Sequence, residues 1–312
     1  MQAQKKFLVI DSNSIIHRAY HALPPLTTKS GQEVGAVYGF LLALFKTLKE
    51  FRPDFVVAAF DFPAPTFRHK EFKAYKAKRP KMPPQLSQQI EQIKEILRIF
   101  GIAVFEKKGF EADDLIGTIA RTISQKQIFP EAEIIILSGD FDTLQLVNSQ
   151  TRVCFPKKGV KETILYDSEL VKEKYDGLKP SQLVDFKALR GDPSDNIPGV
   201  RGIGQKTAIA LIKEFEALEN LYFEIESHTE RAGKIKPRIK ELLIKHKEDA
   251  FFSKQLVQIT CNVPIKFSLE MCRFGKYDEQ KIKALFEKLE FFSLIKKIPE
   301  VFNRKKPKNL LK

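Results

Sequence analysis

Three short apolar runs in the first half of the chain each stop at or just before an aspartate. They are Phe7 to Ile10 before Asp11, Phe55 to Phe60 before Asp61, and Ile134 to Leu137 before Ser138, Gly139 and Asp140. Short uninterrupted apolar runs are typical of strands that are buried on both faces of a parallel sheet. The pattern therefore predicts three parallel strands with acidic residues at their carboxyl ends.

Between these runs, apolar residues recur at helical spacing over residues 40–48, 86–100 and 115–123. Strands that alternate with helices predict an α/β fold. From about Thr163 the pattern becomes helical, with expected helices at 170–175, 181–189, 205–215 and 282–292. We therefore expect an α/β core over residues 1–175, a helical module over 176–300 and a flexible basic tail over 301–312.

The composition narrows the class of partner. The formal net charge is +14, from 53 Lys and Arg against 39 Asp and Glu, which favours a polyanion such as nucleic acid, although solubility alone can explain it. The three cysteines are widely spaced and indicate neither a disulfide framework nor a zinc site, so we expect a reducing cytoplasm. No segment approaches the roughly 20 apolar residues of a membrane span.

Acidic residues follow the predicted strands. Because ligands of open α/β sheets bind beyond the carboxyl ends of the strands, we expect Asp11, Asp61, Asp140 and Asp142 to share one rim. Each of them alone can be a turn or helix-cap residue. Together they would repel one another in a cleft, and divalent cations relieve such repulsion.

Two further groups of acids extend this set. Glu111, Asp113 and Asp114 stand at the start of the helix predicted near residue 115, and Asp192 and Asp195 flank a proline-constrained turn. The alternative for both groups is ordinary helix or turn capping. The chain carries no His or Cys pattern beside these acids, and all-oxygen ligation favours two or more Mg²⁺ or Mn²⁺ ions over zinc.

A glycine-rich segment, 199–208, opens the helix predicted at 205–215. Backbone amides at such a helix start can bind phosphate without reading sequence. The segment nearly matches a nucleotide-binding loop, but Gln205 is one residue too many and no apolar strand precedes it. We predict a DNA contact of the helix-hairpin-helix type, with a simple tight turn as the alternative. The residues expected at DNA are Gly199, Gly202, Gly204, Gln205, Lys206 and Thr207.

Cations and aromatic rings alternate between residues 66 and 79. Arg68, Phe72, Tyr75, Lys76 and Arg79 recur at helical spacing and would share one helix face. A face with both cations and rings suits single-stranded nucleic acid. The alternative is an amphipathic helix with its rings in the core.

With these residues in view, the chain resembles the bacterial 5′ nuclease family, in particular the 5′ nuclease domain of DNA polymerase I and its stand-alone relatives, and more distantly flap endonucleases. The resemblance runs from about Phe7 to Ile295. Six motifs in family order carry it: His17 to Ala22, Phe60-Asp61 with Thr66 to Arg68, Tyr75-Lys76 with Arg79-Pro80, Glu111 to Asp114, Ser138 to Asp140 with Asp142, and Gly191-Asp192 with Ser194 to Gly199.

The resemblance implies a PIN-like parallel-sheet nuclease core, a helical arch over about 64–97 and a helix-hairpin-helix motif in the helical module. One metal group would be held by Asp11, Asp61, Glu111, Asp113 and Asp114, and a second would be served or supported by Asp140, Asp142, Asp192 and Asp195.

The resemblance also assigns roles to basic and aromatic residues. Lys76 and Arg79 would steady the scissile phosphate, Tyr75 would stack on a base, and Arg18 would contact the substrate near the cut, while Arg68 on the basic face is expected at DNA. The glycine hairpin would hold a potassium ion beside the duplex backbone.

The implied activity is two-metal-ion hydrolysis at 5′ flaps and 5′ ends of DNA, as in removal of RNA primers from Okazaki fragments and in repair. Expected partners are DNA with a 5′ flap, nick or overhang, an RNA primer in a DNA hybrid, and a DNA polymerase. We expect a monomer in the bacterial cytoplasm, associated with the nucleoid. Nothing after Phe302 resembles a polymerase, so the chain is a free nuclease or a piece of a polymerase.

The stretch from Phe62 to Pro65 is apolar and stiff, where many relatives carry small or basic residues, so the resemblance does not predict the structure at the base of the arch. Two rival functions remain, a ribonuclease of the related compact α/β metal nucleases and a binder of branched DNA that has lost activity. The glycine hairpin argues against the first, and the presence of every acid argues against the second.

Overall fold

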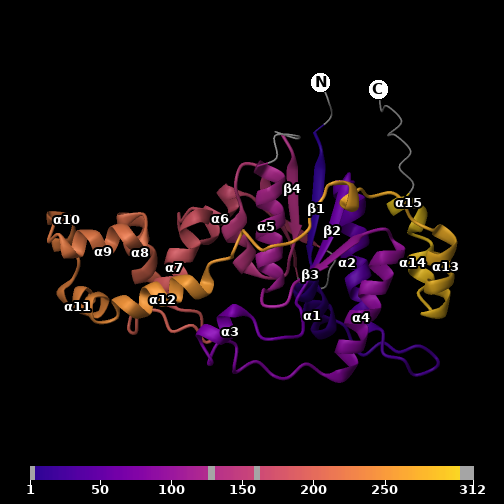
Figure 1. Cartoon of the computed structure of the whole chain (residues 1–312), viewed down its shortest axis with the longest axis horizontal. Coiled ribbons are helices and arrows are strands. Elements are labelled where there is room, and N and C mark those ends of the chain that lie inside the picture. Colours follow the sequence, from indigo (N-terminus) through magenta and orange to yellow (C-terminus); the bar gives the residue numbers. More distant parts are fainter. Residues whose placement is uncertain (1–3, 126–130, 158–161, 303–312) are drawn as a thin grey trace.

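The computed structural model describes residues 4–125, 131–157 and 162–302 (Figure 1). Most of the tail predicted at 301–312 therefore lies outside the described residues. Within these ranges, no helix is both long and apolar enough to cross a bilayer.

A six-stranded sheet forms the centre of the molecule (Figure 1). Its strands lie in the order β3-β2-β1-β4-β5-β6, and only β6 is antiparallel to its neighbour. The strands are β1 (Lys6–Asp11), β2 (Phe55–Phe60), β3 (Ala103–Glu106), β4 (Glu133–Leu137), β5 (Thr151–Pro156) and β6 (Thr163–Tyr166). The three strands predicted from sequence are β1, β2 and β4, the adjacent strands at the centre of the sheet.

The order of the strands explains where a site can form. The chain moves outward from β1 to β2 and β3, and then returns to the other side of β1 with β4. The helix that follows β1 packs in one core, and the 3-10 turn that follows β4 packs in the other, on the opposite face of the sheet. A crevice is therefore expected at the carboxyl ends of these two strands.

Successive side chains of each strand enter two separate cores. In β1, Leu8 and Ile10 pack with one set of helices, while Phe7 and Val9 pack with another. The first core contains α1 (Ser12–Ala22), α2 (Gly35–Phe51) and α4 (Pro84–Ile99). The second contains α5 (Ala112–Gln125). Because both faces are covered, the central residues of β1, β2 and β4 are apolar on both faces of the sheet.

Helices after β6 build a module that extends to one side of the sheet (Figure 1). The helices are α6 (Ser168–Lys174), α7 (Leu183–Arg190), α8 (Gln205–Phe215), α9 (Leu218–Glu226), α10 (Glu230–Gly233), α11 (Pro237–Lys245) and α12 (Lys247–Val257). The 3-10 turn η2 (Pro180–Gln182) precedes α7, and another 3-10 turn, η1 (Phe141–Leu146), lies earlier in the chain, between β4 and β5. Their buried side chains are continuous with the α5 side of the sheet.

The last helices do not belong to this module, contrary to the predicted 176–300 unit. The chain passes through η3 (Glu270–Cys272) to α13 (Glu279–Lys288), α14 (Phe292–Ile295) and α15 (Ile298–Phe302). Phe286 and Phe302 pack against Phe45 of α2 and Phe100, on the other side of the sheet. Periodicity predicts a helix but does not specify the face on which it packs.

Candidate metal centre and active site

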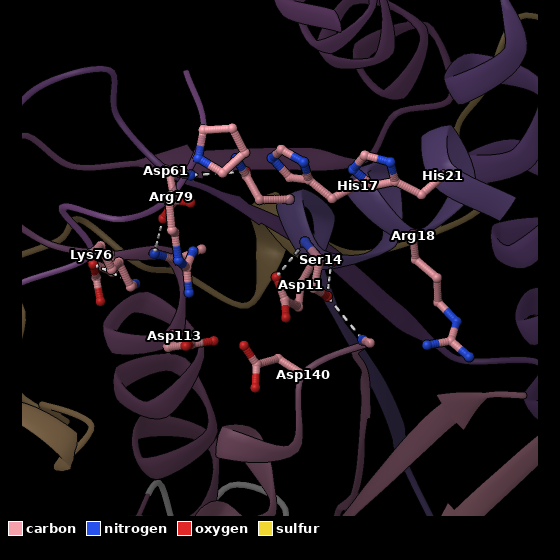
Figure 2. A pocket seen from close by; sticks show the side chains of 15 residues that line it. Asp11, Ser14, His17, Arg18, His21, Asp61, Lys76, Arg79, Asp113 and Asp140 are labelled. Carbon is pink, nitrogen blue, oxygen red and sulfur yellow. Dashed lines mark hydrogen bonds and ion pairs between the residues drawn. The ribbon is translucent and has the colours of Figure 1, made fainter. Parts of the chain in front are cut away.

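A cleft of about 470 Å³ lies at the carboxyl edge of the sheet, and acids from separate elements line it (Figure 2). Asp11 ends β1, Asp61 follows β2, and Asp140 follows β4, while Glu111 and Asp113 stand at the start of α5. In Figure 2, Asp113 and Asp140 turn toward one another beneath Asp11. The predicted rim of carboxylates thus forms.

Asp11 is fixed by the ends of two strands. Its carboxylate accepts hydrogen bonds from Ser14 N at 3.2 Å, as the N-cap of α1, and from Ser138 Oγ at 2.6 Å. Only 3% of Asp11 is exposed. Helix capping and a place in the cleft are therefore compatible in the same residue.

Asp61 connects β2 to the start of α5. Its Oδ1 accepts from Ala112 N at 2.7 Å, and its own N–H donates to Asn13 Oδ1 at 3.0 Å. This places Asp113, in the first turn of α5, beside the strand-end acids.

Two basic residues stand over the acids. Lys76 Nζ donates to Glu111 Oε1 at 2.8 Å, and Arg79 Nη2 donates to Asp195 Oδ1 at 2.5 Å. Lys76 is largely enclosed, whereas half of the Arg79 side chain is exposed. The predicted cations therefore lie beside the acids and line the same cleft.

The predicted helix over 68–79 is wrong. α3 (Phe67–Glu71) ends at Glu71, and Lys76 has a left-handed φ of 53°. Contacts with a loop more than a hundred residues away replace the helical bonds: Lys76 N donates to Asp195 O at 2.9 Å, and Asn196 Nδ2 donates to Ala74 O at 2.8 Å. Long-range pairing here overrides the local spacing.

Tyr75 is not placed to stack on a base. It is 3% exposed, and its hydroxyl donates to Glu111 Oε2 at 3.0 Å. Its ring packs edge-on against His69. Tyr75 instead holds the Glu111 carboxylate in place.

Arg68 does not face DNA, and Asp114 does not face the cleft. Arg68 is 2% exposed, and Asp114 is fully buried. The guanidinium forms a two-pronged pair with the Asp114 carboxylate, at 2.8 and 2.9 Å, and also bonds Leu256 O and Gln258 O. This arrangement contradicts the predicted DNA contact of Arg68, because its guanidinium is used internally. Asp114, predicted to serve the first metal group, pairs with Arg68 and does not line the cleft.

A lysine for which the sequence gives no signal joins the second group of acids. Lys187 on α7 donates to Asp142 Oδ1 and, at 2.7 Å, to Asp192 Oδ2. Asp192 also accepts from Ser194. Asp142, Asp195 and Glu111 line a small cavity that also borders Asp113 and Asp140, so the two predicted metal groups adjoin.

Arg18 and three residues without a predicted role complete the cleft. Arg18, His17 and His21 line it from α1, with the Arg18 guanidinium 5.0 Å from the centre of the Phe155 ring. Asn13 lies at the start of the same helix. His17 and His21 belong to the motif 17–22, so that motif could have signalled them.

The glycine hairpin connects α7 to α8. Gly199 is left-handed, with φ of 61°, and a Cβ there would lie 2.2 Å from Gly191 N. Gly204 is the residue before α8, and Lys206 in its first turn is exposed. Gly199 is therefore required by packing, whereas Gly204 to Lys206 present backbone and charge to solvent.

The crowded acids have altered acidities. Burial raises the pKa of Asp11 and of Asp142 to about 6 each. Burial and the neighbouring Asp11 and Asp140 raise the pKa of Asp113 well above its usual range. Among the described residues, no three His, Cys, Asp or Glu side chains are grouped closely enough to hold an ion as they stand. The carboxylates nevertheless line one cleft, and Asp11 and Asp140 repel Asp113.

Family models match most of the chain. A model described as 5′-3′ exonuclease, N-terminal resolvase-like domain, matches residues 6–176, and one described as 5′-3′ exonuclease, C-terminal SAM fold, matches 178–280. The chain belongs to the 5′-3′ exonuclease family. This membership confirms the resemblance inferred from the motifs and the prediction that the chain is a nuclease.

Curated relatives of this exonuclease are much longer. The chain is 41% identical over 300 residues to DNA polymerase I of Bacillus subtilis, covering 96% of the chain and 33% of the relative. It is 39% identical over 291 residues to the thermostable DNA polymerase I of Thermus thermophilus, covering 93% and 33%. The chain spans about a third of the length of these relatives.

Solved structures share the fold at low sequence identity. A bacteriophage T5 flap endonuclease, in a pseudo-enzyme-product complex with DNA and metal ions, has a TM-score of 0.65 at 18% identity and covers 96% of this chain and 100% of the other. The catalytic core of Rad2 in complex with DNA substrate has a TM-score of 0.61 at 16% identity, with coverage of 96% and 92%. These neighbours confirm the predicted fold class, a largely parallel nuclease sheet with a helical module.

The raised pKa values predict how stability depends on pH and metal. Asp11 and Asp142 bind protons more readily in the folded chain than in the unfolded one, so stability present at low pH is lost as the pH rises through about 6. A divalent ion requires the ionised carboxylates and relieves their repulsion. We expect Mg²⁺ to raise the melting temperature at about pH 7.5 and to do little at about pH 5.

Thermal unfolding with and without Mg²⁺ at each pH measures this difference. At each pH, the increment is the rise in melting temperature that Mg²⁺ causes. Comparing the increments at the two pH values removes the effects of titrating groups that the ion does not contact. An equal increment at both pH values would contradict the expected link between metal and the cleft carboxylates.

Proposed function

We propose that this chain is a structure-specific 5′ nuclease that hydrolyses phosphodiester bonds at 5′ flaps and 5′ ends of DNA. The observation that carries the proposal is the cleft that Asp11, Asp113 and Asp140 line together with Lys76 and Arg79. Acids that gather under cations suit a reaction in which a phosphate diester must be neutralised and held.

The donor set fits hard divalent cations. Every acid that lines the cleft offers oxygen, and the buried carboxylates oppose one another until a cation is added. We infer two or more Mg²⁺ or Mn²⁺ ions. One group would be held by Asp11, Asp61, Glu111, Asp113 and Asp140, and a second would draw on Asp142, Asp192 and Asp195. When bound, such ions supply an activated water and neutralise the phosphoryl oxygens.

The protein's own cations would hold the substrate. Lys76 and Arg79 would exchange their pairs with Glu111 and Asp195 for the scissile phosphate. Arg18, on the far side of the cleft, would contact the nucleotide next to the cut. Tyr75 would act indirectly, because its hydroxyl orients Glu111.

The hairpin would hold the duplex side of the junction. Free backbone N–H groups at the start of α8, together with the exposed Lys206, suit a phosphate backbone without base readout. We infer that Gly202, Gly204, Gln205 and Thr207 contribute to this contact, and that a potassium ion can sit there. The module and the cleft would then contact opposite sides of one junction.

The expected substrates are DNA flaps, nicks and overhangs, including RNA primers annealed to DNA. The matched relatives are DNA polymerases I, so we infer work beside a polymerase, in primer removal and repair, in the bacterial cytoplasm near the nucleoid. We further infer that the nuclease acts as a monomer, because the cleft draws all its acids from one chain.

A cleavage assay tests the proposal. The chain is incubated with a 5′-labelled flap duplex in Mg²⁺ or in a chelator, beside matched RNA-flap, nicked and all-RNA duplexes. We expect cuts near the junction in Mg²⁺ only, and a loss of roughly a hundredfold in rate for Lys76→Ala with the flap still bound. Equal cutting with the chelator, or none with Mg²⁺, would contradict the proposal, and preference for the all-RNA substrate would favour a ribonuclease.

A further inference from the structure

Lys187 joins two acids from different parts of the fold. Asp142 lies in η1, just beyond the carboxyl end of β4, whereas Asp192 lies in the turn after α7. The Lys187 ammonium donates to both carboxylates, and only 15% of its side chain is exposed. One positive charge therefore holds together two carboxylates, one from the sheet edge and one from the helical module.

We propose that Lys187 competes with a divalent ion of the second group: in the metal-free chain its ammonium stands between Asp142 and Asp192, where the ion would bind, and the ion displaces it. The inference rests on the proposed function, because it takes these acids as metal ligands. Beyond that function, it assigns to the protein's own Lys187 ammonium the role of a competitor for the ion.

The geometry supports this role. An ammonium at 2.7 Å from a carboxylate oxygen and a Mg²⁺ ion at about 2.1 Å both draw carboxylates toward one centre. The Asp142 end of the bridge opens on the cavity that Asp113, Asp140 and Asp195 also line. Lys187 thus neutralises that side of the acid cluster without a metal.

Electrostatics sets the direction of the effect. An ammonium and a divalent ion repel, and they cannot both occupy the space between the same two carboxylates. The long lysine side chain can swing away without moving α7. Removing its charge is therefore expected to tighten, not weaken, binding of the second ion.

The chain offers a matched control. Lys254 makes the same kind of bridge, between Asp185 Oδ1 at 2.6 Å and Glu219 Oε2 at 2.7 Å. Neither Asp185 nor Glu219 lines the cleft or the adjoining cavity. Lys254→Met thus removes an equivalent ion-pair bridge at a place where no ion is expected.

Calorimetric titration of the whole chain with Mg²⁺ tests the inference. We expect Lys187→Met to tighten the weaker class of sites by at least about tenfold, and Lys254→Met to leave both classes unchanged. Lys187→Arg keeps the competing charge and should bind like the parent chain. Unchanged or weaker Mg²⁺ binding by Lys187→Met would overturn the inference.

A second measurement uses the unaltered chain, in case Lys187→Met does not fold. The carbon next to the Lys187 ammonium is followed by NMR during the same titration. Its signal should shift as the weaker class fills, whereas that of Lys254 should not, and a static Lys187 signal would overturn the inference. A parent chain that cleaves flaps but fails these tests refutes only this inference, whereas one that binds no Mg²⁺ refutes the proposed function as well.

Discussion

Asp113→Asn is expected to abolish cleavage while making the metal-free chain more stable. Asp113 shares the cleft with Asp11 and Asp140, and burial together with these carboxylates raises its pKa well above the usual range. Replacing it with a neutral isostere removes a charge that is costly without a metal. The same change removes an oxygen donor with negative charge, which divalent ions require.

The expected loss in the rate of flap cleavage is roughly a thousandfold, equivalent to about 4 kcal/mol of transition-state stabilisation. The melting temperature without metal should rise by about 2 °C or more, and the increment from Mg²⁺ should shrink. Single-turnover cleavage and thermal unfolding measure the two effects on the same preparation.

Asp278→Asn is the matched control, because Asp278 caps α13 at the surface, away from the cleft. It should leave cleavage unchanged, since asparagine is also a good helix cap. An Asp113→Asn chain that cleaves within about tenfold of the parent rate, or that melts at a lower temperature, would refute the assigned role.

Arg68→Met is expected to cost roughly 3 to 5 kcal/mol of stability, because it leaves a buried carboxylate without its partner. The guanidinium of Arg68 makes five hydrogen bonds, to Asp114, Glu111 and the carbonyls of Leu256 and Gln258. It thereby ties α3, the start of α5 and the end of α12 to one another. Denaturant unfolding monitored by circular dichroism gives the free energy of unfolding.

The double variant Arg68→Met with Asp114→Leu should regain part of the loss, because the unpaired charge is then gone. Arg79→Met is the contrasting variant: half of the Arg79 side chain is exposed, so cleavage should slow while stability changes by about 1 kcal/mol or less. If Arg68→Met kept the parent stability and lost only DNA affinity, the residue would be a DNA contact after all.

The strand-end acids could be predicted because their position follows from a general property of parallel sheets. Apolar runs that end at or shortly before Asp11, Asp61 and Asp140 predict three strands and the edge at which their carboxyl ends lie. In the structure, β1 lies between β2 and β4, so the three ends are adjacent. The α/β fold, the helix that begins after the glycine hairpin and the cleft itself follow from such local patterns.

The partners of individual side chains could not be predicted in this way. The helix expected through Tyr75 and Lys76 stops early because residues 74–76 bond a loop near Asn196. Arg68 looked like an exposed cation, yet Asp114 and the end of α12 enclose it. Lys187 carried no signal, since its role depends on two acids that only the tertiary fold brings together.

The central claim is that the carboxylate cleft binds divalent ions. Anomalous diffraction from a crystal of this chain soaked in Mn²⁺ tests it most directly. We predict ions within ligand distance of Asp11, Asp113 and Asp140, at Mn²⁺ concentrations that support cleavage. A cleft without bound ions under those conditions, or ions bound only elsewhere on the chain, would contradict it.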